Sequence, residues 1–339
     1  MKELLTKLAN TYGASGREES IASLVKSELE DSADSVKMDK FGNVIATKEG
    51  SSNFSIMLAA HTDEIGLAVE KVSEDGFAFP ARVGGWDPRI LPTNPMKSDD
   101  GWGLVSTSPI ELLDEEDKKK AVRHKDLFIE AQDLSPGGFL VQDAKVTELG
   151  NPNVVVGKSL DDRAGLSVMI EAFKKIEDFE PNIHAVGTVQ EEVGLRGAGV
   201  AAYKLNPDLG IVLEVALADD VPVGGPHTPV VRLGKGPAIT VKDASMISHP
   251  KLTNFLIQVA ESEEIPYQLE LLEHGGTDAG RIHLTREGVP SSVIGIPTRY
   301  LHSPVEVLDV KDLERGVDLL ASTLESLKHS DLESFSTPT

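Results

Sequence analysis

The sequence predicts an α/β protein, with a mixed, mostly parallel sheet flanked by helices and a small β-barrel-like domain inserted into it. Two observations predict this fold. From residue 157 onward, apolar strand-like runs alternate with segments of helical periodicity, which is typical of a parallel sheet covered on both faces. Between about 68 and 155, short β-like runs alternate instead with Pro, Gly and Asp turns. We therefore predict an α/β domain formed by 1–67 and 156–339, interrupted by a β domain at 68–155.

The first α/β segment begins with two predicted helices, at 2–9 and about 17–32, whose apolar residues recur at helical spacing. Two strand-like stretches follow, VKMDKFGNVIATKEG and FSIMLAAHTDEIGLAVEKV, which Gly and Asn punctuate. Within the second stretch, the run IMLAA has no polar member. This pattern is expected of a central strand that is buried on both faces of a sheet.

The second α/β segment is predicted to complete the sheet and its helical cover. Its elements are a helix at about 162–178, strand IHAVGTVQ, helix GLRGAGVAAYKL, strand LGIVLEVAL, a helix at about 250–264, strand YQLELL, strand SSVIGIP and helix VKDLERGVDLLASTLESLK. The final stretch, DLESFSTPT, is expected to be a frayed tail.

The composition argues against several classes of protein. With 339 residues, 40% of them hydrophobic, the chain can bury a substantial core, and no apolar run reaches the ~18 residues that span a bilayer. The net charge of −22 disfavours nucleic-acid binding, because such a surface repels phosphates. The N-terminus reads as a helix rather than a signal peptide, so we expect a cytoplasmic protein without membrane contact. Because there is no cysteine, any metal must be held by histidine and carboxylate, which suits zinc, cobalt or manganese.

Polar residues directly after apolar strands are candidate site residues, because ligands of open α/β sheets bind at the carboxyl ends of strands. His61 and Asp63 follow IMLAA, and Glu191 and Glu192 follow the strand IHAVGTVQ. A carboxylate beside a metal-binding histidine fixes its tautomer, and a metal relieves the repulsion between adjacent glutamates. The structural alternatives are a histidine bonded to a backbone carbonyl and a solvated glutamate pair at a helix N-terminus.

Three further residues are candidates on similar grounds. Asp161 immediately precedes a helix, where an aspartate also serves as an N-cap. Glu214 lies inside the apolar strand LGIVLEVAL, where a lone carboxylate must be paired or metal-bound. His302 follows SSVIGIP on a loop, a position at which a histidine is often simply exposed.

The candidates together suit a site for two metal ions. The proposed ligands are two histidines and three carboxylates: His61, Asp161, Glu192, Glu214 and His302. A bridging carboxylate, with one histidine and one terminal carboxylate per metal, makes a symmetric two-metal site. Such a site lowers the pKa of bound water and clamps an oxyanion, which is hydrolytic chemistry.

At these residues the sequence resembles the M42 family of metallo-aminopeptidases, the tetrahedral and glutamyl aminopeptidases, within the MH clan of co-catalytic zinc peptidases. The matching blocks are AHTDEIG, GGWDPR, SLDDRAG, QEEVGLRGA, GGTDAGRIHL and PTRYLHSPVEVLD, in the family's order from residue 60 to 309. The resemblance implies the fold of these peptidases and two divalent ions per chain, zinc or cobalt. It also implies that the inserted β domain makes dimers, which assemble into tetrahedral dodecamers.

The resemblance further implies roles for the metal ligands. His61 would bind one metal and Asp63, in the H-x-D pattern, would orient it. Asp161 would bridge the two metals. Glu192 and His302 would bind the second metal.

The remaining three candidates also receive roles from the resemblance. Glu191 would be the general base. Glu214 occupies a position where the family usually has Asp, and it is kept as a ligand because Glu serves there in other members of the clan. Asp278, in GGTDAG, would line the substrate side of the cleft. The activity implied is removal of N-terminal residues from short peptides.

Three alternatives stay open at this point. The first is a metal-dependent deacylase or other amidohydrolase on the same scaffold. The second is a glycosidase, because some members of the family are labelled endoglucanases, although two Trp and four Tyr are few for a sugar groove. Loss of activity on metal removal distinguishes a metallopeptidase from a two-carboxylate glycosidase. The third is a binding protein without activity, which the presence of both Glu191 and Asp63 disfavours.

Overall fold

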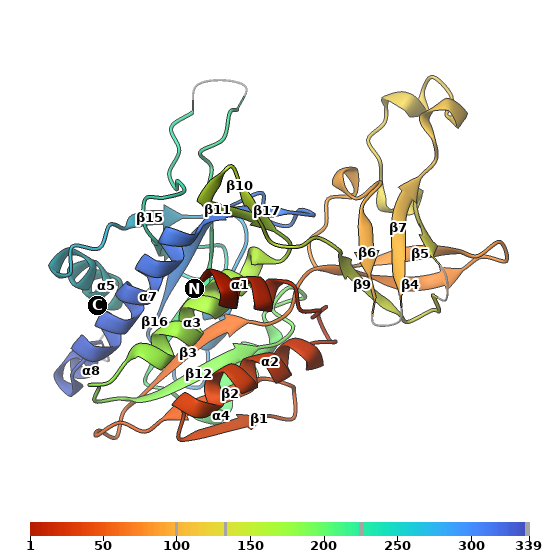
Figure 1. Ribbon diagram of the computed structural model, residues 1–339. Coiled ribbons are helices and arrows are strands. Elements are labelled where there is room, and N and C mark those ends of the chain that lie inside the picture. The colour runs from red at the N-terminus through yellow and green to blue at the C-terminus, as the bar shows by residue number, and fades with distance from the viewer. Residues whose placement is uncertain (99–100, 132–133, 224–226, 336–339) are drawn as a thin grey trace.

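The computed structural model describes residues 1–98, 101–131, 134–223 and 227–335 (Figure 1). An α/β domain occupies one end of the molecule, and a closed barrel of strands forms the other. The predicted fold class, a mixed α/β sheet with helices and a barrel-like insertion, is therefore confirmed.

One large mixed sheet forms the centre of the α/β domain. Its strands are β1 (Ser35–Met38), β2 (Val44–Lys48), β3 (Ser55–His61), β10 (Thr147–Leu149), β11 (Asn151–Gly157), β12 (Asn182–Thr188), β13 (Leu209–Leu217), β14 (Ala238–Lys242), β15 (Gln268–Leu271), β16 (Ser291–Arg299) and β17 (Glu306–Asp309). The order across the sheet is β1-β2-β12-β3-β13-β16-β17-β11-β10, and β14 and β15 join it through β16. The neighbours β12, β3, β13 and β16 are parallel, so their carboxyl ends lie along one edge.

Helices cover both faces of this sheet. They are α1 (Lys2–Ala9), α2 (Glu19–Leu29), α3 (Leu160–Lys175), α4 (Arg196–Leu205), α5 (Pro250–Ser262), α6 (Ala279–Ile282), α7 (Val310–Ser326) and α8 (His329–Phe335). The short 3-10 turns are Glu30–Ser32, Pro88–Ile90, Ile110–Leu112, Asp117–Lys119 and His124–Asp126. Helices α1, α2, α3, α5 and α7 pack against one face, and α4 and α6 pack against the other.

The burial of β3 shows why the central strands are apolar throughout. Ile56 and Leu58 point into the core under α3, whereas Met57 and Ala59 point into the core under α4 and α6. Because side chains alternate between the two faces and both faces are covered, every position needs an apolar residue. This confirms the interpretation of IMLAA as a central, doubly buried strand.

The barrel contains the strands β4 (Gly66–Val72), β5 (Phe77–Val83), β6 (Pro95–Lys97), β7 (Trp102–Thr107), β8 (Leu127–Ala131) and β9 (Phe139–Gln142). Its interior is filled by apolar residues, among them Leu67, Val105 and Ile129. Strand β10 and most of strand β11 lie within the range predicted for the insertion, but both belong to the large sheet, which β11 joins by pairing with β17. Strands β11 and β17 are far apart in the sequence, so their pairing leaves no local pattern, and the sequence could not place β11 and its neighbour β10 in the large sheet.

The C-terminal end corrects one expectation. Residues His329–Phe335 form helix α8 rather than a frayed tail, and Leu332 and Phe335 are buried. The ring of Phe335 packs edge-on against Phe255 of α5, at a centroid distance of 6.0 Å. This docking orders a segment whose composition is mostly polar; the last four residues, 336–339, lie outside the described part of the chain.

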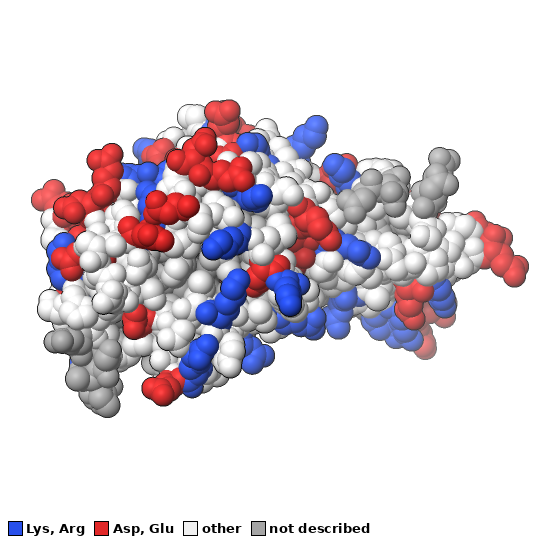
Figure 2. All heavy atoms as spheres, turned by 90° about the horizontal axis from the view of Figure 1, so that it is seen from below, with Lys and Arg blue, Asp and Glu red and all other residues white. Residues whose placement is uncertain are grey.

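The surface carries charges of both signs (Figure 2). On the face seen there, acidic side chains gather over the α/β domain, while basic side chains lie across the middle of the face and on the barrel. On this face the two signs of charge are therefore unevenly distributed. Within the described residues, no helix has the length and apolar character that a bilayer crossing requires.

Candidate metal centre

Three parallel strands bring three of the predicted site segments to the same edge of the sheet. His61 is the last residue of β3, and Glu191 and Glu192 follow the end of β12. Strand β13 pairs with β3 only as far as Val212, opposite Ala59. Glu214 lies two residues beyond Val212, just as His61 lies two residues beyond Ala59, so both side chains stand at the point where β3 ends.

The other two predicted ligands come from a helix start and a loop. Asp161 lies at the beginning of α3, where its backbone and that of Asp162 are not helical. At Gly165 an added Cβ would lie 2.5 Å from Asp162 and 2.7 Å from the β13 backbone, so only glycine lets α3 approach β13 so closely. His302 lies in the turn between β16 and β17.

The structure brings the five predicted ligands together, with Asp161 between the two histidines. The Nε2 atom of His61 is 3.1 Å from Asp161 Oδ1 and 3.6 Å from Glu214 Oε1. On the other side, the Nε2 atom of His302 is 3.5 Å from Asp161 Oδ2 and 3.2 Å from Glu192 Oε2. Each oxygen of the Asp161 carboxylate therefore faces one imidazole, which is the arrangement that a bridging carboxylate needs.

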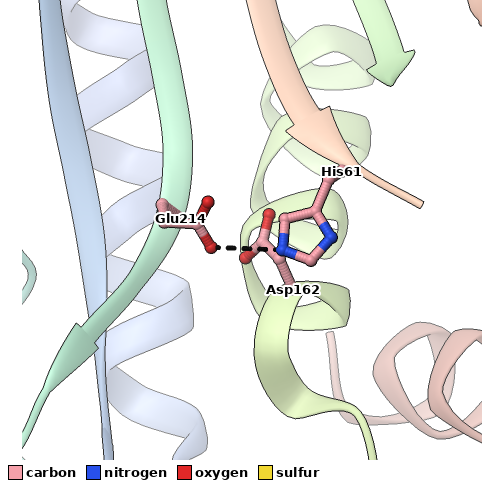
Figure 3. Close-up of side chains that lie close together, drawn as sticks. All are labelled: His61, Asp162 and Glu214. Carbon is pink, nitrogen blue, oxygen red and sulfur yellow. Dashed lines mark ion pairs between the residues drawn. The ribbon is translucent and has the colours of Figure 1, made fainter. Parts of the chain in front are cut away.

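Asp162 is an additional acidic residue that the sequence analysis did not select. Ligand atoms of His61, Asp162 and Glu214 lie within 4.8 Å of one another (Figure 3). Asp162 is fully buried, and its Oδ1 accepts a hydrogen bond from the Gly165 backbone, while its Oδ2 has no partner among the described residues. In the sequence it is the second aspartate of SLDDRAG, and the N-cap interpretation hid its position beside the site.

Asp63 links the first ligand to the glutamate pair. The Nδ1 atom of His61 lies 3.0 Å from the backbone oxygen of Asp63 and 3.5 Å from its Oδ1. The Asp63 carboxylate accepts hydrogen bonds from the backbone N–H groups of Glu191 and Glu192 and from the Ser15 hydroxyl, at 2.9, 3.2 and 2.6 Å. Asp63 therefore restrains the imidazole of His61 and the backbone that presents both glutamates.

Burial perturbs the ionisation of these groups. It raises the pKa of Glu214 to about 7, against the opposing influence of His61, and it raises the pKa of Glu191 well above its usual value. For His61 burial alone would lower the pKa, but the surrounding carboxylates raise it well above its usual value. Burial would also lower the pKa of His302, but the hydrogen bond to Glu192 outweighs the effect of burial and raises this pKa to about 10. Without cations, the cluster therefore retains protons that bound metal ions would displace.

Three of the carboxylates are buried, and histidines are their only positive partners among the described residues. The side chains of Asp161, Glu192 and Glu214 are 10%, 4% and 8% exposed. Within the described residues, only histidines lie at ion-pair distance from these three carboxylates. Burying uncompensated carboxylates is unfavourable, and divalent cations held by nitrogen and oxygen donors remove that penalty. The donor set therefore fits metal ions.

Glu191 and Asp278 lie beside the ligands. The Glu191 side chain is buried and makes no hydrogen bond to a described residue, and its pKa responds to the charges of His61, Glu214 and Asp278. Asp278, immediately before α6, accepts a hydrogen bond from the Thr188 hydroxyl, and burial raises its pKa to about 6. Its second carboxylate oxygen has no partner among the described residues. Both acids thus lie close to the cluster without joining the ligand contacts.

Known proteins resemble this chain over nearly its whole length. Residues 42–319 match the family described as M42 glutamyl aminopeptidase. The chain belongs to the M42 peptidase family. It is 37% identical to a putative aminopeptidase of Acetivibrio thermocellus over 336 residues, which cover 96% of this chain and 98% of that protein. It is also 36% identical to the lysyl aminopeptidase of Pyrococcus furiosus over 345 residues, with 97% and 98% covered.

Solved structures agree with this assignment. A TET aminopeptidase from a marine-sediment Thaumarchaeota archaeon superimposes with a TM-score of 0.95 at 35% identity, covering 99% of this chain and 98% of that one. The TET1 peptidase of Pyrococcus horikoshii, which can assemble into a tetrahedron or a large octahedral shell, has a TM-score of 0.84 at 31% identity, with 96% and 99% covered. The predicted family and activity are confirmed: this M42 peptidase is a hydrolase that acts as an aminopeptidase.

Two segments of this M42 peptidase support the site through contacts that the sequence did not reveal. Glu64, buried directly after Asp63, forms an ion pair with Lys158 at 2.6 Å and lies 3.5 Å from Arg163. In GGWDPR, which the sequence analysis left without a site role, the backbone oxygen of Gly85 lies 3.2 Å from His302 Nδ1. These contacts join residues about 100 to 200 positions apart, so only the folded chain reveals them.

Unusual backbone conformations surround the ligands of this M42 peptidase. Ser159, Gln190 and His302 have φ values of 54°, 57° and 56°, although none is glycine. Each such left-handed conformation costs on the order of 1 kcal/mol of folding free energy. It persists only where the surrounding structure holds the residue in place. Ser159 and Gln190 lie within two residues of Asp161 and Glu192, and His302 is itself a candidate ligand. Within the described part of the chain, three of the nine residues other than glycine that have a positive φ therefore lie at the site.

Proposed function

We propose that this M42 peptidase removes N-terminal residues from short peptides with two divalent cations, zinc or cobalt, bound per chain. His61 and Glu214 would hold one cation, His302 and Glu192 the other, and Asp161 would bridge them. The observation that carries the proposal is the position of Asp161, whose two carboxylate oxygens face the two imidazoles at 3.1 and 3.5 Å. The finding that only histidines neutralise the three buried carboxylates among the described residues supports it.

The chain's own residues would supply the proton transfers. When bound, the two cations would polarise the scissile carbonyl and activate the attacking water. Glu191 would accept a proton from that water on its carboxylate and pass it to the nitrogen of the leaving amine. Its burial, and the absence of hydrogen bonds from its side chain to described residues, suit a carboxylate that is free to move a proton. Asp63 would hold the Glu191 backbone in place through its 2.9 Å hydrogen bond.

The preferred substrate has a free α-amino group at its N-terminus. We place Asp278 on the substrate side, because it lies close enough to affect the ionisation of Glu191 but makes no ligand contact. A deacylase on the same scaffold would prefer an acylated nitrogen, and a glycosidase would act on oligosaccharides.

Matched substrates separate these activities. Aminoacyl chromogenic substrates should be hydrolysed, whereas the same substrates with an acetylated α-amine should react at least about 100-fold more slowly, because a buried site built for one polar group rejects an analogue that lacks it. Both should be measured by the release of the chromophore, with a cello-oligosaccharide as a third substrate. Faster hydrolysis of the acetylated substrate would favour the deacylase, and release of reducing sugar would favour the glycosidase.

We further propose that the inserted domain, 68–155, mediates dimerisation and that dimers build a larger shell, such as a tetrahedral dodecamer. Several large apolar side chains of this domain are exposed, among them Trp102, Ile110 and Leu112, at 51%, 60% and 78%. Several exposed large apolar side chains on one domain are typical of a protein–protein interface. The shells formed by the TET1 peptidase of Pyrococcus horikoshii support the same proposal. The cytoplasmic location and the absence of nucleic-acid and membrane partners stay predictions.

Light scattering tests the assembly. The expected mass at micromolar concentration is a multiple of that of the 339-residue chain, and Leu112→Glu with Ile110→Glu should lower it because two charges would enter an apolar contact. Met38→Glu, at an exposed apolar position of the α/β domain, is the control and should leave the mass unchanged. A wild-type protein that scatters as a monomer with metal present would refute the proposal.

A further inference from the structure

We infer that Glu306 is a positioning residue of the metal centre, holding the bridging carboxylate and the more exposed histidine by their backbones. Glu306 is the first residue of β17 and is 2% exposed. Its Oε2 accepts a hydrogen bond from the Asp161 N–H at 2.9 Å, and its Oε1 accepts one from the His302 N–H at 3.2 Å. The inference rests on the proposed function, because Asp161 and His302 are ligands only if metals bind.

Among the described residues, Glu306 is the only hydrogen-bond acceptor for the N–H groups of Asp161 and His302. Asp161 lies at the start of α3, where the first N–H groups of a helix have no acceptor within the helix. His302 has a φ of 56°, a conformation that needs outside contacts to persist in a residue other than glycine. The two residues are 141 positions apart in the sequence, and one carboxylate joins them.

Glu306 cannot be explained as part of an ordinary ion pair. Among the described residues, no Lys or Arg lies within ion-pair distance of its carboxylate, which is buried beside the acidic residues Asp161 and Glu192. A buried carboxylate in that setting is unfavourable. Its presence is understandable if two acceptor oxygens are required, because both of its partners are N–H donors.

Glutamine tests this requirement, because its amide has one acceptor oxygen and one NH₂ donor. At position 306 the NH₂ group would face one of two N–H donors, so one hydrogen bond must be lost. Glu270 in β15 provides a matched control: it is also 2% exposed and accepts hydrogen bonds from the Leu217 N–H at 3.1 Å and the Thr240 hydroxyl at 2.9 Å. A hydroxyl can also accept, so glutamine satisfies both partners at position 270 but not at position 306.

The test is zinc binding by the full-length protein in its native assembly. After removal of metal, zinc is titrated in competition with a chromogenic chelator, and bound metal is counted by elemental analysis. We expect two ions in the wild type and in Glu270→Gln. In Glu306→Gln, the affinity for one ion should fall by about 10- to 100-fold, the usual effect of removing a group that orients a metal ligand. That ion should be the one held by His302 and Glu192. The other ligands do not depend on Glu306, because the backbone oxygen of Asp63 holds the His61 ring and Glu214 lies within strand β13.

A second measurement separates positioning from simple helix capping. If Glu306 only stabilises the fold, Glu306→Gln lowers the melting temperature of the metal-free protein while both zinc affinities stay at the wild-type values, and this result overturns the inference. Glu306→Asp keeps the charge but is too short to reach both N–H groups, and we expect it to weaken the same ion. If both variants fail to fold, the role is structural and the inference is wrong.

The outcome for the wild type distinguishes this inference from the proposed function. A wild-type chain that binds no zinc refutes both. A wild type that binds a single ion refutes the two-metal proposal, and the inference then stands or falls on whether Glu306→Gln weakens that ion relative to Glu270→Gln. Two ions with equal affinities in all variants refute the positioning role alone.

Discussion

Replacing Glu191 by glutamine is expected to lower the turnover number by ~10² to 10⁴, the usual range for removal of a general acid–base group. The substitution keeps the shape of the side chain and removes the only proton acceptor that we assign to the reaction. Because Glu191 makes none of the ligand contacts among His61, Asp161, Glu214, Glu192 and His302, metal content should stay at two ions per chain. Steady-state kinetics and elemental analysis on the same preparation measure both quantities.

Glu192→Gln is the control for this prediction, because it changes the neighbouring residue in the same chemical way. The Glu192 carboxylate lies 3.2 Å from His302 Nε2, so replacing it by a neutral amide should weaken the metal at that side. Activity should fall, and excess metal should restore part of it, which it cannot do for Glu191→Gln. If Glu191→Gln loses metal and Glu192→Gln keeps both ions but is inactive, the two roles must be exchanged. If neither substitution affects hydrolysis, the proposed mechanism is wrong.

Removing the metal should abolish activity, with a loss on the order of 10³-fold or more, because several kcal/mol of transition-state stabilisation are assigned to the cations. Dialysis against a chelator, followed by the aminoacyl substrate assay, measures this effect. Adding zinc or cobalt back should restore activity and saturate at two ions per chain. The control is the far-ultraviolet circular dichroism of the metal-free protein, which should show that the fold survives the treatment.

Two results would contradict this second prediction. Full activity with no more than one ion per chain would show that two ions are not needed for catalysis. The protein would then be a hydrolase with a single metal ion. Undiminished activity in the chelated protein would exclude a metallopeptidase mechanism and leave a chemistry based on Glu191 and its neighbouring carboxylates. The rates regained with zinc and with cobalt, compared at equal occupancy, identify the better cofactor.

The elements of the α/β domain were predictable from the sequence because their patterns are local. Apolar runs such as LGIVLEVAL are strands in the structure, and β13 spans the whole of that run, Leu209–Leu217. The predicted helix at 2–9 is α1, and the predicted closing helix is α7, which ends at Ser326. Helix α8 was missed because only two apolar residues, Leu332 and Phe335, mark its buried face. Its order depends on packing against α5, which a local pattern does not record.

The candidate ligands were also recognisable from the sequence, for a topological reason. Parallel strands deliver the residues that follow them to one edge of the sheet, so His61, Glu191 and Glu192 could be predicted to meet. Glu214 was recognisable because a lone carboxylate inside an apolar strand needs a partner. These inferences used two things: the direction of the strands and the free-energy cost of burying a charge. Both can be judged from the sequence without knowing which distant residues are in contact.

What the sequence by itself determined is therefore the fold class and the set of ionisable groups at one edge of the sheet. Only the tertiary structure decided which of these groups face each other and what supports them. Asp161 lies between the imidazoles because α3 approaches β13 at Gly165, and Glu306 reaches Asp161 and His302 because β17 pairs with β11. Such contacts join segments far apart in the chain, and hydrogen bonds of this kind depend on differences of a few tenths of an ångström that no residue pattern encodes.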